Sequence, residues 1–490
     1  MTIPNENKQA NINRFPVLTS KTLHAANFIF NSPFAFQLAT DCVFVEKIVR
    51  ILPQKRLVAF GTWQNKPIVA KFFFSSQRAK QHVEKELKGI KLLQDCRVPT
   101  PILLEHSISQ DKKVHVLIFE RIQDAENLYE IWQYKKHTQA ILPLLQSVMI
   151  ELATQHVFGI LQHDLHLKNF LVNEKNVYML DGATVERCTP LLSKKTSMQH
   201  LALFLSQLGA GVEDQQLCLF NYYAKLRGWL IKEEDKSELF YLIKQCNEKR
   251  WKKFEKKIFR ETSHFSRKQD WQTLLIYNRQ YAFPEFLAFL QDPESVFQRD
   301  DITLLKNGRS STVIKVTLDQ RELVVKRYNM KNRWHHLRRC LRSTRAYASW
   351  RLAQKLSLFY LPTPRPVAMI EKKFMKLRGK SYFVTEYVAG EHASDFFTRH
   401  AQDEEKTSTM VKRIVALLKG IAKLEITHGD LKMTNVLVNR HEQPVIIDLD
   451  SAAEHLSLSS LHRGWKKEIK RLLENFHHLP NVKEKFEQVL

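Results

Sequence analysis

Apolar residues follow two kinds of pattern along this chain. Runs in which every second residue is apolar, rich in Val, Ile and Phe, occupy residues 64–74, 114–122, 320–330 and 381–390. This alternation predicts β-strands with one buried face. Apolar residues spaced three or four apart occupy residues 141–160 and 409–424 and predict helices. Strands precede helices in each half, which indicates an α+β fold.

The order of these predicted elements repeats. Each half contains a strand, a helix, a Pro-Thr-Pro turn, two strands, a helix and a polar loop. The two loops, residues 162–181 and 427–450, share an Asp, an Asn five residues later, the string Leu-Val-Asn and an apolar run closed by Asp. A repeat of this length indicates a duplicated domain rather than a solenoid.

The repeat divides the chain into three parts. Residues 1–40 are expected to form an N-terminal extension, residues 41–290 the first domain and residues 295–490 the second. Pro, Asp and Ser within residues 291–301 mark the expected boundary. Helices expected over residues 199–260 are assigned to the end of the first domain.

Composition narrows the class of protein. With 490 residues, 44% hydrophobic and 26% charged, the chain has the balance of a soluble globular protein. No apolar run reaches the ~20 residues of a membrane-spanning helix, and the polar N-terminus does not resemble a signal peptide. The six cysteines form no C-x-x-C pair, so neither a zinc site nor a disulfide framework is indicated. We therefore expect a cytoplasmic protein.

The net charge of +25 favours an anionic partner, either nucleic acid, an anionic membrane surface or a phosphorylated substrate. Residues 323–370 contain no acid, and Arg338, Arg342 and Arg345 are spaced for one helix face. This face is either solvated or a surface for phosphates and anionic lipid headgroups. No nucleic-acid-binding motif accompanies the charge, so nucleic acid is not expected.

The repeated strings contain the residue types that phosphoryl transfer needs. Transfer requires a Lys on the nucleotide phosphates, oxygen ligands for Mg²⁺ and a carboxylate near the attacking hydroxyl. Lys71 and Lys326 follow apolar strand residues, and each loop begins with a candidate catalytic carboxylate, Asp164 or Asp430. Candidate Mg²⁺ ligands follow in both loops: Asn169, Asp181, Asn435 and Asp448.

These strings resemble the protein-kinase-like superfamily. Together with residues 304–316, 324–339, 342–356 and 360–371, they more narrowly resemble the Kdo/heptose lipopolysaccharide kinase (Kdo/WaaP-type) family of Gram-negative bacteria, its tandem-domain members in particular. The resemblance covers residues 45–475. It implies two tandem protein-kinase-like domains, each with a sheet-rich N-lobe and a helical C-lobe, and ATP and Mg²⁺ bound between the lobes.

The resemblance also implies roles for single residues. Asp164 and Asp430 match the catalytic aspartate, and Glu86 matches the helix acid that holds Lys71. The Mg²⁺ ligands and phosphate lysines match the residues named above. Gly308 and Ser310, within residues 307–312, provide the expected phosphate-covering loop of the second copy.

Each copy departs from the family pattern. The corresponding loop of the first copy, residues 52–57, has no Gly, and Gln162 stands where the second copy has His428. In the second copy, Ser349 falls at the position of Glu86. We therefore expect Lys326 to lack an ion-pair partner and the first copy to carry most of the turnover.

The expected function is ATP-dependent phosphorylation of a sugar hydroxyl, on heptose or Kdo, of the lipopolysaccharide inner core. The expected partner is this core or a lipid-linked saccharide, with peripheral contact at the cytoplasmic face of the inner membrane as an open possibility. Two alternatives remain at this point. One is a kinase for protein or a small metabolite, and the other is a nucleotide-binding scaffold without turnover.

Overall fold

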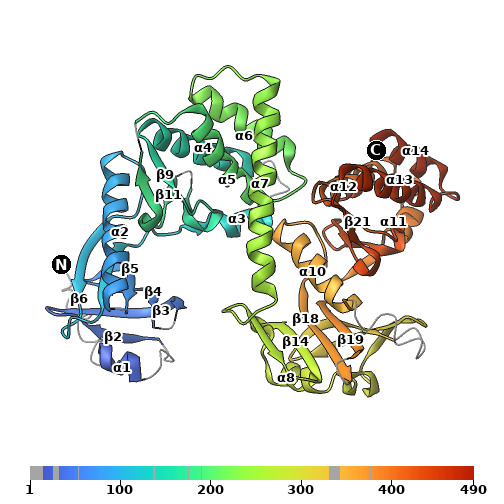
Figure 1. Ribbon diagram of the computed structural model, residues 1–490, viewed down its shortest axis with the longest axis horizontal. Helices are drawn as coiled ribbons and strands as arrows, with labels where there is room; N and C mark the ends of the chain where they lie inside the picture. Colours follow the sequence, from blue (N-terminus) through green and yellow to red (C-terminus); the bar gives the residue numbers. More distant parts are fainter. Residues whose placement is uncertain are drawn as a thin grey trace, which may run out of the picture. The chain divides into compact units, whose positions relative to one another are not determined.

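The computed structural model of the chain describes residues 15–25, 32–52, 54–74, 76–135, 140–174, 176–188, 190–329, 343–374 and 377–490 (Figure 1). The chain forms two compact units. The first comprises Met1–Gln207 and Asp214–Leu242, and the second comprises Leu208–Glu213 and Ile243–Leu490. Each unit contains a seven-stranded sheet and a helical part, so the expected mixed α+β class is confirmed.

The sheet of the first unit contains β1 (Val17–Leu18), β2 (Phe34–Gln37), β3 (Cys42–Leu52), β4 (Arg56–Trp63), β5 (Lys66–Phe73), β7 (His115–Glu120) and β6 (Leu103–Ile108), in this spatial order. Period-2 alternation buries one face, where Leu57 and Ala59 pack against Phe72 and Val116. Helix α1 (Ser20–Ala25) contributes Leu23 to this core. The long helix α2 (Ser76–Asp95) carries the buried residues Val83 and Ile90.

The helical part of the first unit contains α3 (Leu128–Lys135), α4 (Ile141–Val157), α5 (Lys194–Leu205) and α6 (Glu213–Leu226). Its loops are held by short strands and turns: β8 (Glu126–Asn127), β9 (Ile160–Gln162), η2 (Leu167–Asn169), β10 (Phe170–Asn173), β11 (Asn176–Met179), η3 (Gly182–Thr184), β12 (Val185–Arg187) and η4 (Ser206–Leu208). The following helix, α7 (Glu233–Ile258), begins in the first unit and ends in the second.

The sheet of the second unit contains β13 (Phe265–Gln269), β14 (Thr273–Asn278), β18 (Pro366–Phe374), β19 (Leu377–Glu386), β17 (Arg321–Tyr328), β16 (Ser311–Leu318) and β15 (Thr303–Asn307), in this spatial order. Between β14 and β15 lie η5 (Arg279–Tyr281), α8 (Pro284–Gln291) and η6 (Ser295–Gln298). Helix α10 (Arg345–Leu358) precedes β18, and the buried Trp350 joins it to the core of this unit.

The helical part of the second unit contains α11 (Ala393–Arg399), α12 (Glu404–Lys423), α13 (Leu458–Glu474) and α14 (Pro480–Val489). Its short strands and turns are β20 (Gly390–His392), β21 (Ile426–Thr427), η7 (Met433–Asn435), β22 (Val436–Asn439), β23 (Pro444–Ile446), η8 (Leu449–Ser451) and β24 (Ala453–Glu454). None of the helices in the described ranges combines the length and apolarity needed to cross a bilayer.

The two units divide earlier in the chain than the composition suggested. Strand β14 pairs with β18, with Tyr277 opposite Ala368, and its residues Leu275 and Ile276 are buried in the second unit. The polar stretch at residues 291–301 therefore lies within the second unit, after α8. At the other end, β1 and β2 hydrogen-bond to the first sheet, so the expected extension over residues 1–40 contributes strands to it.

Helix α2 approaches the loop after β11 very closely in the first unit. A Cβ atom added to Gly89 would lie 1.8 Å from the backbone oxygen of Gly182. Only a residue without a side chain fits at this contact, which brings Glu86, one turn earlier on α2, beside the loop. The corresponding residue of α10 in the second unit, three after Ser349, is Leu352.

We predict that Gly89→Ala lowers the free energy of unfolding of the first unit by about 1–3 kcal/mol, because the added methyl group overpacks the contact. Thermal unfolding monitored by circular dichroism measures the effect. Lys88→Ala is the control, since Lys88 is exposed on the same helix. A Gly89→Ala variant that unfolds at the parent's temperature would show that α2 can move away from the loop at no cost.

Candidate functional site

The two Asp-to-Asn loops have the same backbone geometry. The Nδ2 of Asn169 donates to the carbonyl oxygen of Asp164 at 2.7 Å, and the Nδ2 of Asn435 donates to that of Asp430 at 2.8 Å. In each loop the bond folds the Asn back toward the Asp, as expected for a metal-ligating amide. The Oδ1 atom of each Asn is left as an acceptor for a cation.

The closing aspartates also correspond. Asp181 and Asp448 both lie in the left-handed region, with φ of 66° and 60°, and each precedes a single 3₁₀ turn. The Pro-Thr-Pro turns bond to the same strand position: the Thr100 hydroxyl donates to Met179 at 2.9 Å, and that of Thr363 donates to Ile446 at 3.0 Å. Equivalent residues in the two units can therefore be matched by their contacts.

The replacement of His428 by Gln162 changes little. The His428 Nε2 bonds the carbonyl oxygen of Ile447 at 2.8 Å, and the Gln162 Nε2 bonds that of Leu180 at 2.7 Å. Both side chains thus tie the start of the catalytic loop to the residue before the closing Asp. An amide and an imidazole supply the same N–H donor here.

In the first unit, Lys71 has the partner that the family resemblance implied. Its ammonium lies 2.5 Å from the Oε1 of Glu86, which is only 1% exposed. The other Glu86 oxygen accepts the backbone N–H of Ala183 at 3.3 Å. Helix α2 is therefore joined both to the lysine strand and to the loop after Asp181.

In the second unit, the expectation that Lys326 lacks an acid partner is wrong. Its Nζ lies 2.6 Å from an oxygen of Asp448 and 2.7 Å from an oxygen of Asp450. Asp450 also accepts hydrogen bonds from the hydroxyl groups of Tyr328, at 2.6 Å, and Ser349, at 3.2 Å. The second carboxylate comes from the loop instead of the helix.

Each unit has one carboxylate at the contact between the helix and the loop. The helix supplies it in the first unit, and the loop supplies it in the second. Where the first unit has Glu86 on the helix and Ala183 in the loop, the second has Ser349 on the helix and Asp450 in the loop. The feature of the sequence that could have revealed this partner is the second acid, Asp450, two residues after Asp448. A search for an acid near the helix missed it, because Asp450 follows Lys326 by more than a hundred residues.

The relocation changes the charge of the metal-binding aspartates. Burial would raise the pKa of Asp448, but the ammonium of Lys326 holds this pKa below its ordinary value. In the first unit, burial and the neighbouring Glu86 carboxylate raise the pKa of Asp181. Asp448 is therefore the candidate ligand whose anionic form is favoured, since Lys326 lies 2.6 Å from one of its oxygens and Lys306 lies 3.9 Å from the other.

Two cations lie next to the Asp430 carboxylate in the second unit. One comes from its own loop and the other from helix α13. The Oδ1 of Asp430 lies 3.2 Å from Lys432 and 3.2 Å from Arg471 of α13. In the first unit the residue two positions after Asp164 is His166, whose Nε2 lies 3.5 Å from the carboxylate. A permanently charged lysine therefore lies next to the Asp430 carboxylate, whereas a histidine occupies the equivalent position beside Asp164.

A cavity of about 510 Å³ is lined by half of the candidate residues of the second unit. Lys326, Asn435 and Asp448 lie on its wall with further polar residues, such as Glu386 and Asp450, and with apolar residues of both sheet and helical parts, among them Val313, Val324, Phe383, Leu437 and Ile447. Asp430 does not line this cavity, but its carbonyl oxygen is hydrogen-bonded to Asn435, which does. Gly308 and Ser310 are not among the residues that line it. The Gly308 N–H donates to Ser311 at 3.0 Å, which makes a tight turn above β16.

These residues fit Mg²⁺ and nucleotide phosphates. Within the described ranges no three His, Cys, Asp or Glu side chains cluster as a metal site, and each loop offers one carboxylate and one amide. Mg²⁺ is commonly held by one or two carboxylates together with substrate phosphates, so two protein ligands are sufficient. In the first unit, the buried Oδ1 of Asp181 has no hydrogen-bond partner, which leaves it available to a cation.

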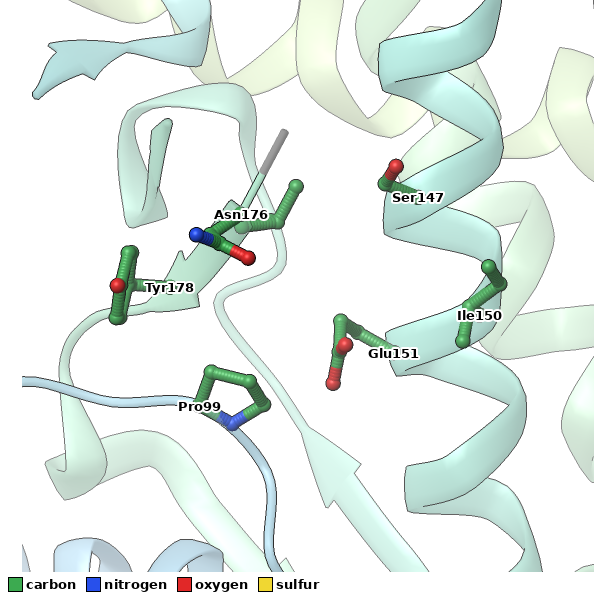
Figure 2. A pocket seen from close by; sticks show the side chains of 7 residues that line it. Pro99, Ser147, Ile150, Glu151, Asn176 and Tyr178 are labelled. Carbon is green, nitrogen blue, oxygen red and sulfur yellow. The ribbon is translucent and has the colours of Figure 1, made fainter. Parts of the chain in front are cut away.

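A second hollow, of about 340 Å³, lies in the first unit away from these residues (Figure 2). Pro99, β11 and α4 line it, and the carboxylate of Glu151 points from α4 into it. Burial raises the pKa of Glu151 to about 7. In the second unit the corresponding residue of α12 is the buried Leu417, and residues 208–213 pack beside it, with Gly211 close to Gly420.

The basic window of the sequence is described only in part. Arg338 and Arg342 lie outside the described residues. Arg345 is the first residue of α10 and is half-buried. The proposed anionic surface on this window stays a prediction.

Comparison with known proteins confirms the family resemblance for the second unit. Residues 298–490 match the model of the lipopolysaccharide kinase (Kdo/WaaP) family. A 3-deoxy-D-manno-octulosonic acid kinase of Haemophilus influenzae (strain PittEE) is 29% identical over 143 residues, which cover 27% of this chain and 58% of the relative. The corresponding kinase of Actinobacillus succinogenes is 29% identical over 142 residues, with the same coverage.

Similarity also extends to a protein kinase. Serine/threonine-protein kinase 1 of Heliothis zea nuclear polyhedrosis virus is 35% identical over 85 residues, 17% of this chain and 32% of the relative. The chain thus spans little more than half the length of the lipopolysaccharide-related kinases that it matches. All three relatives are named as kinases, which agrees with the phosphotransferase chemistry expected from the sequence.

We predict that Asp450→Ala lowers the free energy of unfolding of the second unit by about 2 kcal/mol, because it leaves Lys326 with one carboxylate partner and removes the charged acceptor of the Tyr328 and Ser349 hydroxyl groups, which keep only their mutual contact. Transplanting the arrangement of the first unit tests the cause. Ser349→Glu and Tyr328→Phe, added to Asp450→Ala, are expected to recover at least half of the loss in a thermal or urea unfolding experiment. A triple variant no more stable than Asp450→Ala would contradict the exchange of carboxylates.

We also predict a pH-dependent cost at Glu151. Because the pKa of Glu151 in the folded chain, about 7, lies above the ordinary value of 4.5, the contribution of this carboxyl to the stability of the first unit is complete below pH 4.5 and is lost as the pH rises through 7. Glu151→Gln should remove this loss and stabilise α4 at pH 8 by about 1 kcal/mol, since partial exposure screens the effect.

Hydrogen exchange of the α4 amides at pH 5 and pH 8, corrected for intrinsic rates, measures the Glu151 effect. Glu84→Gln, at an exposed position of α2, is the control and should change neither value. Equal gains from Glu151→Gln at both pH values would mean that the ionisation of this carboxyl is not the source of the cost.

Proposed function

We propose that the chain is a kinase built from two tandem protein-kinase-like domains and that its second unit transfers phosphate from ATP to a sugar hydroxyl of the lipopolysaccharide inner core. The observation that carries this proposal is the wall of the 510 Å³ cavity, where Lys326, Asn435 and Asp448 lie together. An apolar cleft with a few convergent charged groups is the ordinary form of a nucleotide site.

The residues of the second unit divide the work of phosphoryl transfer. Lys326, held by Asp450, is positioned to bind the nucleotide phosphates. Asn435 and Asp448 would hold Mg²⁺, which supplies positive charge to the phosphates when bound. Asp430 orients the acceptor hydroxyl and takes its proton, and Lys432 offsets the charge on the transferred group.

The first unit is proposed to bind nucleotide with little or no turnover. It retains the Lys71–Glu86 pair, but it has His166 in place of Lys432 and an Asp181 carboxyl that burial and Glu86 favour in its protonated form. Leu52 pairs with Arg56 where the second unit has its Gly-containing loop, and residues 52–57 contain no Gly. This assignment reverses the division of labour expected from sequence, because the partner of Lys326 has been found.

The acceptor is inferred from the relatives. The matching family is one of lipopolysaccharide kinases, and two matching kinases are named for 3-deoxy-D-manno-octulosonic acid, so a core sugar, Kdo or heptose, is the proposed substrate class. Such an acceptor is available at the cytoplasmic face of the inner membrane, where we place the protein as a peripheral enzyme.

Phosphate analysis of the core oligosaccharide tests this function. Core isolated from cells that lack the protein should contain less phosphate than core from the parent cells, and the purified protein with ATP and Mg²⁺ should restore it. Unchanged core phosphate, together with ATP-dependent labelling of a protein or small metabolite, would transfer the activity to another acceptor.

We predict that Asp430→Asn lowers the rate of phosphate transfer to isolated core at least a hundredfold, because the hydroxyl loses its proton acceptor. Asp164→Asn, its matched counterpart in the first unit, should leave at least half of the parent rate. Rates measured on one core preparation decide between the units. Loss of activity in Asp164→Asn with retention in Asp430→Asn would show that the first unit carries the reaction.

A further inference from the structure

Helix α13 combines two properties that the proposed phosphoryl transfer does not use. One face carries five cations and, at its C-terminal end, a single acid, Glu474, and the segment at the start of the helix exposes two leucines. The opposite face is anchored: Leu472 and Glu468 are buried, and Trp465, Ile469 and Leu473 pack against the core of the second unit. The helix is therefore a fixed part of this unit, and its outer face points to solvent.

The cations form a continuous stripe along α13. Their spacing of three and four residues places them on one side of the helix, about 12 Å long at 1.5 Å per residue. All are exposed, and the four that precede Arg471 form no ion pair within the described part of the chain. The stripe consists of Arg463, Lys466, Lys467, Lys470 and Arg471.

One exposed acid, Glu474, lies on this face of α13, beyond the end of the stripe, so acids do not alternate with the cations as they do on a typical solvated helix face. On α7 the exposed lysines Lys252, Lys253 and Lys256 alternate with acids such as Glu248 and Glu255. On α13 Glu468 is turned inward, where it accepts the backbone N–H of Gly429. The outward charge of α13 is therefore concentrated enough to bind an anionic surface.

Two leucines precede the stripe at the start of the helix. Leu456 is 104% exposed and Leu458 is 75% exposed relative to a reference chain. Between them lies Ser457, whose hydroxyl accepts the backbone N–H of Ser460 and fixes the turn that presents both side chains. Fully exposed apolar side chains beside clustered cations match the interface of a bilayer, where the apolar groups enter the acyl boundary and the cations meet headgroups.

We propose that α13 with residues 456–457 is the surface by which the second unit binds an anionic phospholipid bilayer. The stripe ends at Arg471, which donates to the backbone oxygen of Gly429 at 2.6 Å and lies 3.2 Å from the Asp430 carboxylate. A bilayer seated on the stripe is thus within one helix length of the catalytic loop. The inference rests on the proposed function in one respect, since a lipid-anchored saccharide presented at this surface reaches Asp430.

Co-sedimentation with vesicles tests the proposal on the full chain. The probes are vesicles of phosphatidylcholine alone and of phosphatidylcholine mixed with an equal amount of phosphatidylglycerol. Lys466→Gln, Lys467→Gln and Lys470→Gln together should weaken binding to the anionic vesicles about a hundredfold, since each cation near such a surface contributes about a factor of five. Leu456→Ser with Leu458→Ser should weaken binding about tenfold.

A matched variant controls for net charge. Lys252→Gln, Lys253→Gln and Lys256→Gln remove the same charge from exposed positions of α7 and should leave vesicle binding unchanged. Equal losses from the α7 and α13 triple variants would overturn the proposal, because binding would then follow net charge alone. Inositol hexakisphosphate is the soluble probe: tight binding of it through α13, with no binding to anionic vesicles, would equally overturn the bilayer assignment.

The two proposals fail separately. Thermal unfolding with and without Mg²⁺-ATP, compared between the parent chain and Asp448→Asn, reports the second unit's nucleotide site, and none of the residues substituted on α13 and α7 lines the cavity. Normal nucleotide stabilisation with no vesicle binding by the parent chain would remove the bilayer surface and leave the kinase proposal intact. Vesicle binding that depends on α13, without any nucleotide stabilisation, would remove the kinase proposal and leave the surface.

Discussion

A largely buried lysine on the fifth strand of each seven-stranded sheet, Lys71 on β5 or Lys326 on β17, sets the constraint on which the rest of each unit depends. A buried ammonium is costly unless a carboxylate lies against it, so the strand, the neighbouring helix and the metal-binding loop must meet at one place. In the first unit the carboxylate is Glu86 of the helix, and Gly89 lets the helix touch the loop. In the second unit the carboxylate is Asp450 of the loop, and no close helix–loop contact is needed.

The location of this carboxylate decides the chemistry of the metal-binding aspartate. Each unit holds two carboxyls close to one lysine ammonium, but in the first unit burial and the neighbouring Glu86 carboxylate raise the pKa of Asp181. In the second unit the hydroxyl groups of Tyr328 and Ser349 donate to Asp450, which spreads its charge and leaves Lys326 to keep Asp448 ionised. Lys71 thus pairs with a helix carboxylate in the first unit, whereas the equivalent Lys326 lies against Asp448, the candidate cation ligand, in the second.

Much of this arrangement was predictable from sequence, because the repeated strings fix their own local geometry. The Asn169 and Asn435 amides fold back as their five-residue spacing indicated, and the strand lysines face the closing aspartates. The origin of the Lys326 partner was not predictable from local spacing, since Asp450 reaches it through tertiary packing. The start of the second unit was missed for a similar reason: β13 and β14 are assigned to their sheet by pairing with β18, not by a feature of their own sequence.

Duplication explains why one contact could be solved twice in different ways. Moving the carboxylate from helix to loop requires three correlated residues, Ser349, Tyr328 and Asp450, and any one change alone leaves a buried charge or hydroxyl unpaired. A second copy that holds nucleotide or structure can tolerate such intermediates, whereas a single catalytic domain cannot. The presence of both solutions in one chain therefore favours a division of roles between the units. On the function proposed above, the second unit, with Lys432 and an Asp448 whose pKa Lys326 lowers, carries the phosphoryl transfer, and the first unit retains the fold without it.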